Sequence, residues 1–502
     1  MARALHLRPA GGTRHLRSSV AHVALVLVAT VAACERTDPT ASSVTGPGNP
    51  SRSLIDDGTP SHAEAELLRQ LAAAKNITPL VHPAPVRKEL VLLGQALLFD
   101  PILSGNRDIA CMTCHLPAFA TGDGRNLSIG QGGIGFGPQR QLGKGFVIPR
   151  NAPPLFNLTM LSSLFWDGRV SRDSNGTFHT PANAQLSPQM ASVFEFGPAS
   201  AIGLFPVTSR TEMRAFVGGA TTLGGFPKPG NELALLADSD FTGIWSALMK
   251  RLGAIPAYRQ MFEAAYPGTP FSSMTFAHAT NAMGGFFTDR MSFNNSPWDK
   301  FLAGDDHALS PQEFRGGNTF VTTKCSGCHG GPTFTDGKFR NVALAQFGPG
   351  QGNGPSGHDD FGRLNVTGVA TDKYLFRTSP LRNIELSGPY GHAGEFAKLR
   401  DFVDHYSDAD NKLINYDVTQ IEASLRPTLL NNTADILATR SGALTGLFFT
   451  PEQIDDITAY LRALTDPAAK NMSSLTPGKV PSGLPVAGVA PGGLGSAIPF
   501  TP

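Results

Sequence analysis

The sequence predicts an all-α fold made of two domains of one design, wrapped by long loops. Three observations predict it. The pattern C-x-x-C-H occurs twice, at residues 111–115 and 325–329, and a predicted helix leads into each copy. Gly and Pro are abundant, at 55 and 39 residues, while only 16% of residues are charged. This composition fits compact helical domains with long loops better than a bundle of long helices.

The repeated pattern is the attachment signal of c-type haem. Its two thiols add to the vinyl groups of the porphyrin, and the histidine is held below the ring as the proximal iron ligand. A cytochrome c domain has a characteristic order of elements: a helix, the C-x-x-C-H motif, loops and then a terminal helix. The sequence therefore predicts two cytochrome c-type domains with one covalent haem in each. The predicted haem-binding residues are Cys111, Cys114, His115, Cys325, Cys328 and His329.

Two other interpretations of the cysteine pairs need to be weighed. The four thiols could form a zinc site, or one pair could be a redox dithiol. The pairs lie about 210 residues apart, far beyond the spacing of a zinc ribbon. Neither alternative explains a histidine directly after both pairs.

An export signal is predicted at residues 1–34. Four arginines precede the first acidic residue, an apolar run covers residues 23–33, and small residues lead to Cys34. The form is similar to a bacterial lipoprotein signal, in which the cysteine becomes the lipidated first residue. The run is too short to span a bilayer. We expect a location in the periplasm or on another extracytoplasmic face, where haem is attached, with a lipid anchor at Cys34. An ordinary cleaved signal is the alternative.

The first part of the mature chain divides into a tether and a domain. Residues 35–80 are expected to form a flexible tether, rich in Ser, Thr, Pro and Gly, and then a short helix. Ser61 and Glu64 have the spacing of a capping box at the start of that helix. The first haem domain is placed at residues 81–305 and opens with an apolar helix over residues 88–99.

The second haem domain is placed at residues 306–466. The segment SPQE at residues 310–313 predicts a capped helix start, and TPEQ at residues 450–453 predicts the start of the last helix. Residues 467–502 are rich in Pro, Gly and Ser, so we expect a disordered tail. The formal net charge is +1, which excludes the basic footprint of a nucleic-acid-binding protein.

A haem that only carries electrons usually has a second strong ligand, whereas a haem that reacts with a small oxidant needs a vacant face. No histidine lies between His115 and His179, and the methionine of that stretch, Met160, is expected in the core. The first haem is therefore expected to be five-coordinate. After His329 the only methionine is Met472, in the tail, so a methionine ligand is not expected at the second haem. The nearby candidates there are His358, Tyr390, His392, His405 and Tyr406.

The chain resembles the bacterial di-haem cytochrome c peroxidases and their MauG-type relatives over roughly residues 88–465. Each matching block is weakly specific, but their order together with both haem motifs is highly specific. The blocks are LGQALLFDP at residues 93–101, RNAPPLFN at 150–157, FWDGR at 165–169, FRTSPLRN at 376–383 and PYGHAG at 389–394.

The resemblance implies roles for particular residues. Trp166 matches the tryptophan that passes electrons between the haems. Glu212 matches the distal glutamate, and a carboxylate over an open iron can move a proton between the oxygens of a peroxide, as general base and then general acid. Asn151, Thr378 and Pro380 match the ligands of an inter-haem calcium, a hard cation that takes oxygen ligands.

The resemblance also implies an axial ligand for the second haem. Tyr406 lies 14 residues after His392, at the place where the peroxidases have a methionine ligand and the MauG-type enzymes have a tyrosine. A phenolate stabilises ferric and higher iron states better than a thioether does. Tyr406 is therefore expected as the iron ligand opposite His329. The second haem would then share stored oxidising equivalents with the first one.

The sequence departs from the family pattern before Glu212. About 26 extra residues separate Trp166 from Glu212. Ile202 stands where the family has a glutamine ten residues before the glutamate. The insertion could cap the distal pocket, narrow it, or bring a histidine to the iron, and one of its glutamines could replace the missing one. Its relevant residues are His179, Gln185 and Gln189.

These observations predict an exported di-haem peroxidase-like oxidoreductase. Hydrogen peroxide is expected to react at the N-terminal haem, and electrons to pass through Trp166 to or from the C-terminal haem. The MauG-type branch, which oxidises a partner protein, is favoured. A conventional peroxidase with a small redox-protein donor and a non-enzymatic di-haem electron carrier are the alternatives. The resemblance also makes a homodimer an option, although the sequence leaves the oligomeric state open.

Overall fold

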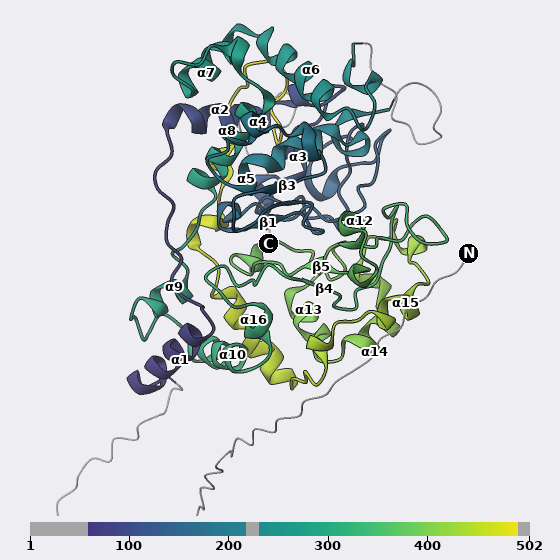
Figure 1. Ribbon diagram of the computed structural model, residues 1–502. Coiled ribbons are helices and arrows are strands. Elements are labelled where there is room, and N and C mark those ends of the chain that lie inside the picture. The colour runs from purple at the N-terminus through teal and green to yellow at the C-terminus, as the bar shows by residue number, and fades with distance from the viewer. Residues whose placement is uncertain (1–58, 217–229, 490–502) are drawn as a thin grey trace, which may run out of the picture. The chain divides into compact units, whose positions relative to one another are not determined.

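The computed structural model describes residues 59–216 and 230–489, so the export signal predicted at residues 1–34 lies outside the described part of the chain. All described residues belong to one unit, Asp56–Pro502. Helices and helical turns make up most of its regular structure, and two small sheets are added to them (Figure 1). The expected helical fold is confirmed in this coarse sense.

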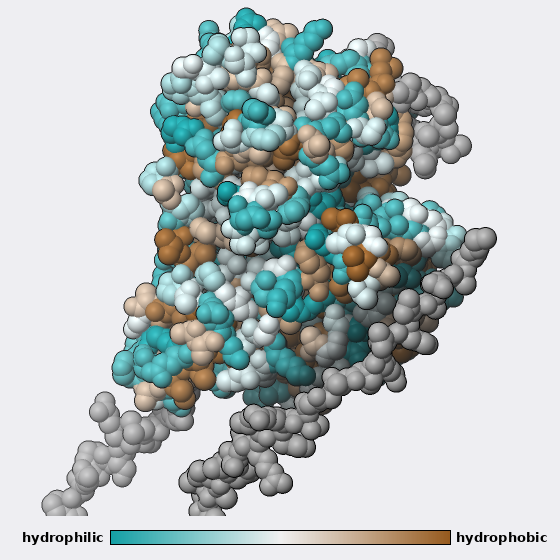
Figure 2. All heavy atoms as spheres, viewed as in Figure 1, coloured by the Kyte–Doolittle hydropathy of each residue, from teal (hydrophilic) through white to brown (hydrophobic). Residues whose placement is uncertain are grey.

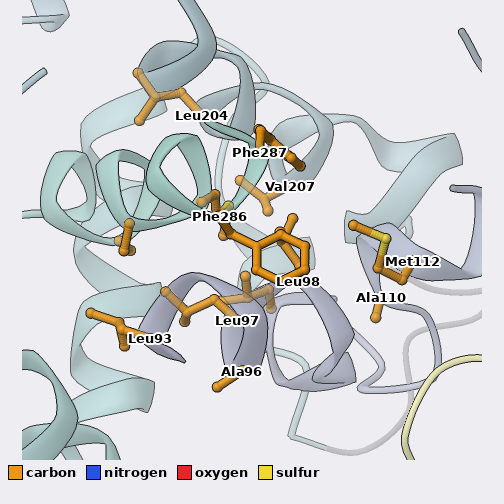
Figure 3. Packing of buried hydrophobic residues seen from close by; sticks show 14 of the residues in the cluster. Leu93, Ala96, Leu97, Leu98, Ala110, Met112, Leu204, Val207, Phe286 and Phe287 are labelled. Atoms are coloured by element: carbon orange, nitrogen blue, oxygen red, sulfur yellow. The ribbon is translucent and has the colours of Figure 1, made fainter. Parts of the chain in front are cut away.

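One group of helices surrounds the first motif. It comprises α2 (Lys88–Phe99), α3 (Cys111–Cys114), α4 (Pro188–Ala191), α5 (Pro198–Ala201), α6 (Phe241–Gly253), α7 (Pro256–Ala265) and α8 (Phe276–Arg290). The apolar run of α2 packs against α8, and Figure 3 shows Leu97 and Leu98 beside Phe286 of α8. A Cβ atom on Gly94 would lie 2.0 Å from the carbonyl oxygen of Ala282, so this crossing requires a glycine.

A second group of helices surrounds the second motif. It comprises α1 (His62–Ala74), α9 (Pro297–Leu302), α10 (Pro311–Thr322), α11 (Cys325–Cys328), α12 (Leu364–Thr367), α13 (Leu399–His405), α14 (Ala409–Ile414), α15 (Thr433–Ala438) and α16 (Pro451–Arg462). α10 packs against α16, and α1 joins α10. The predicted capping boxes are present at Ser61 and Ser310, where they start α1 and α10. The last helix starts at the predicted place, and Thr450 forms a capping box there at the start of α16.

The two groups of helices have separate hydrophobic cores. The first core is built from α2, α5, α7 and α8 together with the loops between them. The second core includes Trp298, Phe301 and Tyr460, and it also takes up Leu68 of α1. The short helix predicted after the tether therefore packs on the second core, although it precedes the first one in the chain.

Two small antiparallel sheets shape the region between the cores. The first has the order β1 (Ser163–Leu164), β2 (Val170–Arg172) and β3 (Phe178–His179). The second pairs β4 (Phe339–Arg340) with β5 (Phe376–Arg377), with Phe339 opposite Arg377. The loop between β1 and β2 contains Trp166, so this sheet fixes the base of the tryptophan loop.

The expectation of a disordered tail from residue 467 is wrong for residues 467–489, and residues 490–502 lie outside the described part of the chain. Short 3-10 turns cover Pro467–Lys470 and Ser473–Leu475. Apolar side chains spaced along this segment pack into the first core, which composition alone does not reveal. They are Ala469, Met472, Val480, Val486 and Ala487.

Polar contacts also hold this C-terminal segment on the first group of helices. Gln95 donates to the carbonyl oxygen of Leu475 at 2.8 Å, and the Ser482 hydroxyl donates to the Asp100 carboxylate at 2.6 Å. The chain thus returns from α16 to α2, where the segment is drawn in yellow (Figure 1).

Within the described ranges, no helix is both long and apolar enough to cross a bilayer. The face in Figure 2 mixes hydrophilic and hydrophobic residues.

Candidate active site

The first motif forms α3 and faces a cavity with about 1100 Å³ of open space. Cys111, Cys114 and His115 all line this cavity. Ring nitrogen Nδ1 of His115 lies 2.8 Å from the carbonyl oxygen of Thr121. Because a carbonyl oxygen only accepts, Nδ1 carries the proton and Nε2 is left to bind a metal.

The second motif forms α11 and faces a larger cavity, with about 1750 Å³ of open space. Cys325, Cys328 and His329 line it, and Nδ1 of His329 lies 2.9 Å from the carbonyl oxygen of Phe334. Burial lowers the pKa of both His329 and His115, so both imidazoles stay neutral, as a metal ligand must be. The two sites therefore fit a thioether-linked haem with a proximal histidine.

The cysteines fit neither a four-cysteine zinc site nor a redox dithiol. The two pairs line different cavities, so they do not meet in a four-cysteine site. In the described part of the chain, no cluster of three or more His, Cys, Asp and Glu residues could hold a metal ion. Burial raises the pKa of Cys111 and of Cys114 to about 12, whereas a redox dithiol needs a lowered thiol pKa.

Trp166 lies between the two sites, because its side chain lines both cavities. Its indole N–H donates to the carbonyl oxygen of Asn151 at 2.9 Å. Its own carbonyl oxygen accepts from the backbone N–H of Arg377 at 2.8 Å. Arg363 donates to the next two carbonyl oxygens, those of Asp167 and Gly168, at 2.9 and 3.0 Å. Arginines of the second half of the chain thus fix this loop.

A buried charge network lies beside Trp166. The guanidinium of Arg150 donates to Asp167 at 2.5 Å and to both carboxylate oxygens of Asp360 at 2.6 and 2.8 Å. All three side chains are buried. Burial alone would raise the pKa of Asp360, but the charge of Arg150 holds that pKa below its usual range. The network joins residues from the two halves of the chain.

Glu212 lines the first cavity, as the sequence predicts. It lies in the π-helical turn Arg210–Arg214, where its backbone N–H donates to the Ser209 hydroxyl at 3.3 Å. Burial raises the pKa of its carboxyl group, and the positive charges of Arg169 and Arg150 oppose this shift. A raised pKa brings the group closer to working pH, which suits a proton carrier.

The insertion before Glu212 does not reach the first cavity. His179 lies in β3, where its side chain is 62% exposed and contacts Asp173 at 3.0 Å. Gln185 bonds to the backbone at Ser239 and Thr242, and neither Gln185 nor Gln189 lines the cavity. The structure therefore rules out His179 as an iron ligand here, since a hairpin turns the insertion outward.

Two methionines line the first cavity, and the sequence did not single them out. Met213 is 3% exposed and Met283 is 1% exposed. Met160 is 36% exposed instead of belonging to the core. Among the lining residues in the described ranges, His115 is the only histidine. The position of Met213 next to Glu212 was a signal in the sequence, whereas α8 had to be placed before Met283 could be found.

Three further residues line the first cavity, and they come from widely separated segments of the chain. Arg169 lines it, with its guanidinium 3.7 Å from the centre of the Phe165 ring. Ile202 lines it at the place of the family glutamine, and Gln351 reaches it from the second half of the chain. Only the fold brings Gln351 there.

Tyr406 is among the described residues that line the second cavity. Tyr406 lines it together with Tyr390 and His392, whereas His358 and His405 do not. No methionine lines it in the ranges that the structure describes. Burial raises the pKa of Tyr406, and the nearby charge of Arg340 opposes that shift.

His392 is less suited to bind iron than its position suggests. Its ring stacks on Phe376, with ring centres 3.7 Å apart, and its Nδ1 lies 2.7 Å from the Glu395 carboxylate. Both His392 and Glu395 are buried. This ring is held by its neighbours in the cavity wall.

The three residues predicted to bind calcium all line the second cavity. The side-chain amide of Asn151 donates to the carbonyl oxygen of Arg125 at 2.9 Å, which leaves its oxygen as an acceptor. The Thr378 carbonyl accepts from Thr335 at 2.6 Å, and its hydroxyl accepts from Arg340 at 2.7 Å. The guanidinium so close to Thr378 disfavours a cation there, so calcium stays a prediction.

The chain is similar to known proteins. The family model for di-haem cytochrome c peroxidase matches residues 88–307. Cytochrome c551 peroxidase of Pseudomonas aeruginosa is 28% identical over 361 residues, which cover 70% of this chain and 82% of that protein. Methylamine utilization protein MauG of Methylorubrum extorquens is 26% identical over 350 residues, which cover 69% and 77%. A MauG-like protein associated with microbial copper homeostasis has a crystal structure with a TM-score of 0.50 and 25% identity, covering 78% of this chain and 93% of that one.

Proposed function

The chain belongs to the di-haem cytochrome c peroxidase and MauG family and is a peroxidase-type oxidoreductase, and from this premise we propose a division of labour between its two cavities. Hydrogen peroxide is reduced in the first cavity, and electrons pass by way of Trp166 to or from the second. The observation that carries the proposal is that Trp166 lines both cavities while Glu212 lines only the first.

The haem groups would be held by the two motifs. Cys111, Cys114 and His115 hold one, and the second motif holds the other. When bound, each haem supplies the redox chemistry of its iron, which no side chain of the chain can provide. The contribution of the protein is to set ligands, protons and distances.

Glu212 handles the protons in the first cavity. As a carboxylate it takes the proton from one oxygen of peroxide. As an acid it then gives that proton to the other oxygen, which leaves as water. Its raised pKa supports the second step, and the charges of Arg169 and Arg150 keep enough carboxylate for the first.

Trp166 provides the path between the cavities. Its ring is held by the indole bond to Asn151, and its backbone is held by the bond from the Arg377 N–H to its carbonyl oxygen. A fixed ring between two redox centres keeps the transfer distance constant.

Tyr406, which lines the same cavity as His329, is proposed as a second residue that would hold the iron of this haem. The absence of methionine from the described lining of the second cavity supports this assignment. It favours a MauG-type enzyme that oxidises a side chain of a partner protein. A conventional peroxidase with a small redox-protein donor is the second candidate, since cytochrome c551 peroxidase is among the relatives.

The test is the low-temperature EPR spectrum of the oxidised protein, followed by addition of peroxide. One high-spin and one low-spin ferric signal, with an immediate response to peroxide, supports the proposal. Two low-spin signals with no response would favour a di-haem electron carrier. Fast turnover with a small cytochrome or copper protein would favour the conventional peroxidase.

Export and calcium are further parts of the proposal. The haem motifs require attachment outside the cytoplasmic membrane, which agrees with an exported chain anchored through Cys34. Mass spectrometry of the mature N-terminus tests the anchor. Calcium at Asn151, Thr378 and Pro380 is tested by metal analysis before and after chelation.

A further inference from the structure

Tyr374 lies in the wall of the second cavity, between the turn Ala370–Asp372 and β5. Its side chain is buried, at 1% exposure. Its phenol donates to a carboxylate oxygen of Asp359 at 3.0 Å, and Asp359 is itself 4% exposed. The cavity therefore has a phenol in its wall whose proton already points at a buried carboxylate.

No other tyrosine of the chain combines these two features. All seven tyrosines lie in the described ranges, and three of them line the second cavity: Tyr374, Tyr390 and Tyr406. Tyr390 donates to a peptide carbonyl, that of Glu385, at 3.1 Å, and a peptide carbonyl is not a base. Tyr258 donates to the Asp100 carboxylate at 2.7 Å but lines neither cavity.

Charge around the ring decides how such a phenol can be oxidised. The ammonium group of Lys373 lies 4.9 Å from the centre of the Tyr374 ring and forms an ion pair with Asp435 at 3.4 Å. A positive charge over the ring opposes a cationic radical. Oxidation is therefore favourable only if the phenolic proton leaves together with the electron, and Asp359 is placed to take that proton.

We propose that Tyr374 is a redox-active residue that stores one oxidising equivalent beside the second haem. Its phenol gives one electron to the oxidised haem held by His329, and its proton moves to the Asp359 carboxylate. The products are a neutral tyrosyl radical, a carboxylic acid and a haem reduced by one electron. Return of an electron and of the same proton restores the pair.

This inference depends on the proposed function in one respect, because peroxide chemistry in the first cavity supplies the oxidising equivalent. Burial protects the radical from solvent and from external reductants. Such a store would hold the equivalent until a partner protein binds.

The first experiment is freeze-quench EPR of the di-haem protein after addition of peroxide. Ring-deuterated tyrosine identifies a tyrosyl signal by its narrower hyperfine pattern and separates it from a radical on Trp166. We expect the signal in the wild type and in the matched control Tyr390→Phe, and its loss in Tyr374→Phe. A tyrosyl signal of unchanged size and shape in Tyr374→Phe overturns the proposal.

The proton acceptor is tested by Asp359→Asn. Asparagine keeps an oxygen acceptor for the phenol but removes the base, so the variant separates packing from proton transfer. The rate of radical formation should fall by about 100-fold, as expected for loss of a positioned base. An unchanged rate in Asp359→Asn would show that the proton goes elsewhere and would overturn the assignment of Asp359.

A second source of oxidant separates this inference from the proposed function. A ruthenium(III) complex generated by a light flash oxidises the di-haem protein without peroxide. A signal that depends on Tyr374 under flash oxidation, but not with peroxide, would support this inference and count against peroxide chemistry. A response of the haem spectrum to peroxide with no Tyr374 radical under either oxidant would support the proposed function and overturn this inference.

Discussion

At the scale of single residues, the described lining of the first cavity combines one acidic residue, Glu212, with two arginines whose side chains are held in place. Arg150 is fixed by Asp167 and Asp360, and Arg169 by Asp167 and the Phe165 ring. These fixed charges act on the carboxyl group of Glu212, whose pKa burial raises. The pKa of Glu212 is therefore tuned by residues that are held for structural reasons.

Replacing Glu212→Gln should slow the reaction with peroxide by roughly 10²–10⁴-fold, because the side chain keeps its size but can no longer carry a proton. Stopped-flow absorbance of the haem bands measures this rate. Glu89→Gln, at an exposed position of α2, is the matched control and should react like the wild type. A rate within about twofold of the wild type in Glu212→Gln would remove the glutamate from the mechanism.

Replacing Arg169→Gln should shift the pH profile. The rate rises with pH as Glu212 loses its proton, so the acid limb reports the pKa of Glu212. Removing a positive charge raises that pKa further, and the acid limb should move to higher pH. Arg169→Lys, which keeps the charge, should restore most of the wild-type position. Rates measured between pH 4 and pH 8 decide this, and an acid limb that stays in place would mean that the charge of Arg169 is not felt by Glu212.

At the scale of elements, each core depends on one close helix crossing. A Cβ atom on Gly316 of α10 would lie 1.9 Å from the carbonyl oxygen of Asp456 in α16. Gly94 has the same role between α2 and α8. The sequence shows both glycines inside predicted helices but not their partners, because the crossing is a tertiary contact.

Gly316→Ala should destabilise the protein, by roughly 1–3 kcal/mol, because the backbone atoms that the methyl group meets cannot move aside as a side chain can. Gly442→Ala is the matched control, since nothing lies within 4 Å of its Cβ position. Thermal melting of both variants tests this. Equal melting temperatures for the two variants would show that the α10–α16 crossing relaxes at little cost.

The sequence predicted the elements well where the signal is local. Helices start at Ser61, Ser310 and Thr450 as expected. The motifs could be assigned from their spacing alone, since haem attachment requires neighbouring residues. The positions of the insertion around His179 and of the tail after residue 467 could not be predicted. Each position depends on the surface against which the segment packs, and that is a tertiary contact.

At the scale of the whole molecule, contacts between residues far apart in the sequence could not have been predicted from local pattern. Arg150 meets Asp360 across 210 positions and so joins the two halves of the chain. Within the second half, Tyr374 meets Asp359 only because the loop between them doubles back. Resemblance to a family predicted the region of Trp166 and Glu212, and the structure brings both to the first cavity. Their roles there stay predictions until they are tested.

Replacing Asp360→Asn tests whether the Arg150 network joins the halves. Arg150 keeps Asp167 but loses one of two buried carboxylates, so the loss of stability should be about 3 kcal/mol, the low end for a broken buried pair. Calorimetry of the di-haem protein should show a lower melting temperature for Asp360→Asn than for the wild type at pH 7.

The difference in melting temperature between the wild type and Asp360→Asn should depend on pH, because the pKa of Asp360 is lowered in the folded chain. A carboxyl group with a lowered folded pKa stabilises the protein above its ordinary pKa of about 4. This stabilisation is lost as the pH falls below that value toward the folded pKa. The gap in melting temperature between wild type and Asp360→Asn should therefore be largest near neutral pH and shrink below pH 4. A gap that stays constant in acid would mean that the asparagine acts through packing, and that the charge on Asp360 does not hold the two halves together.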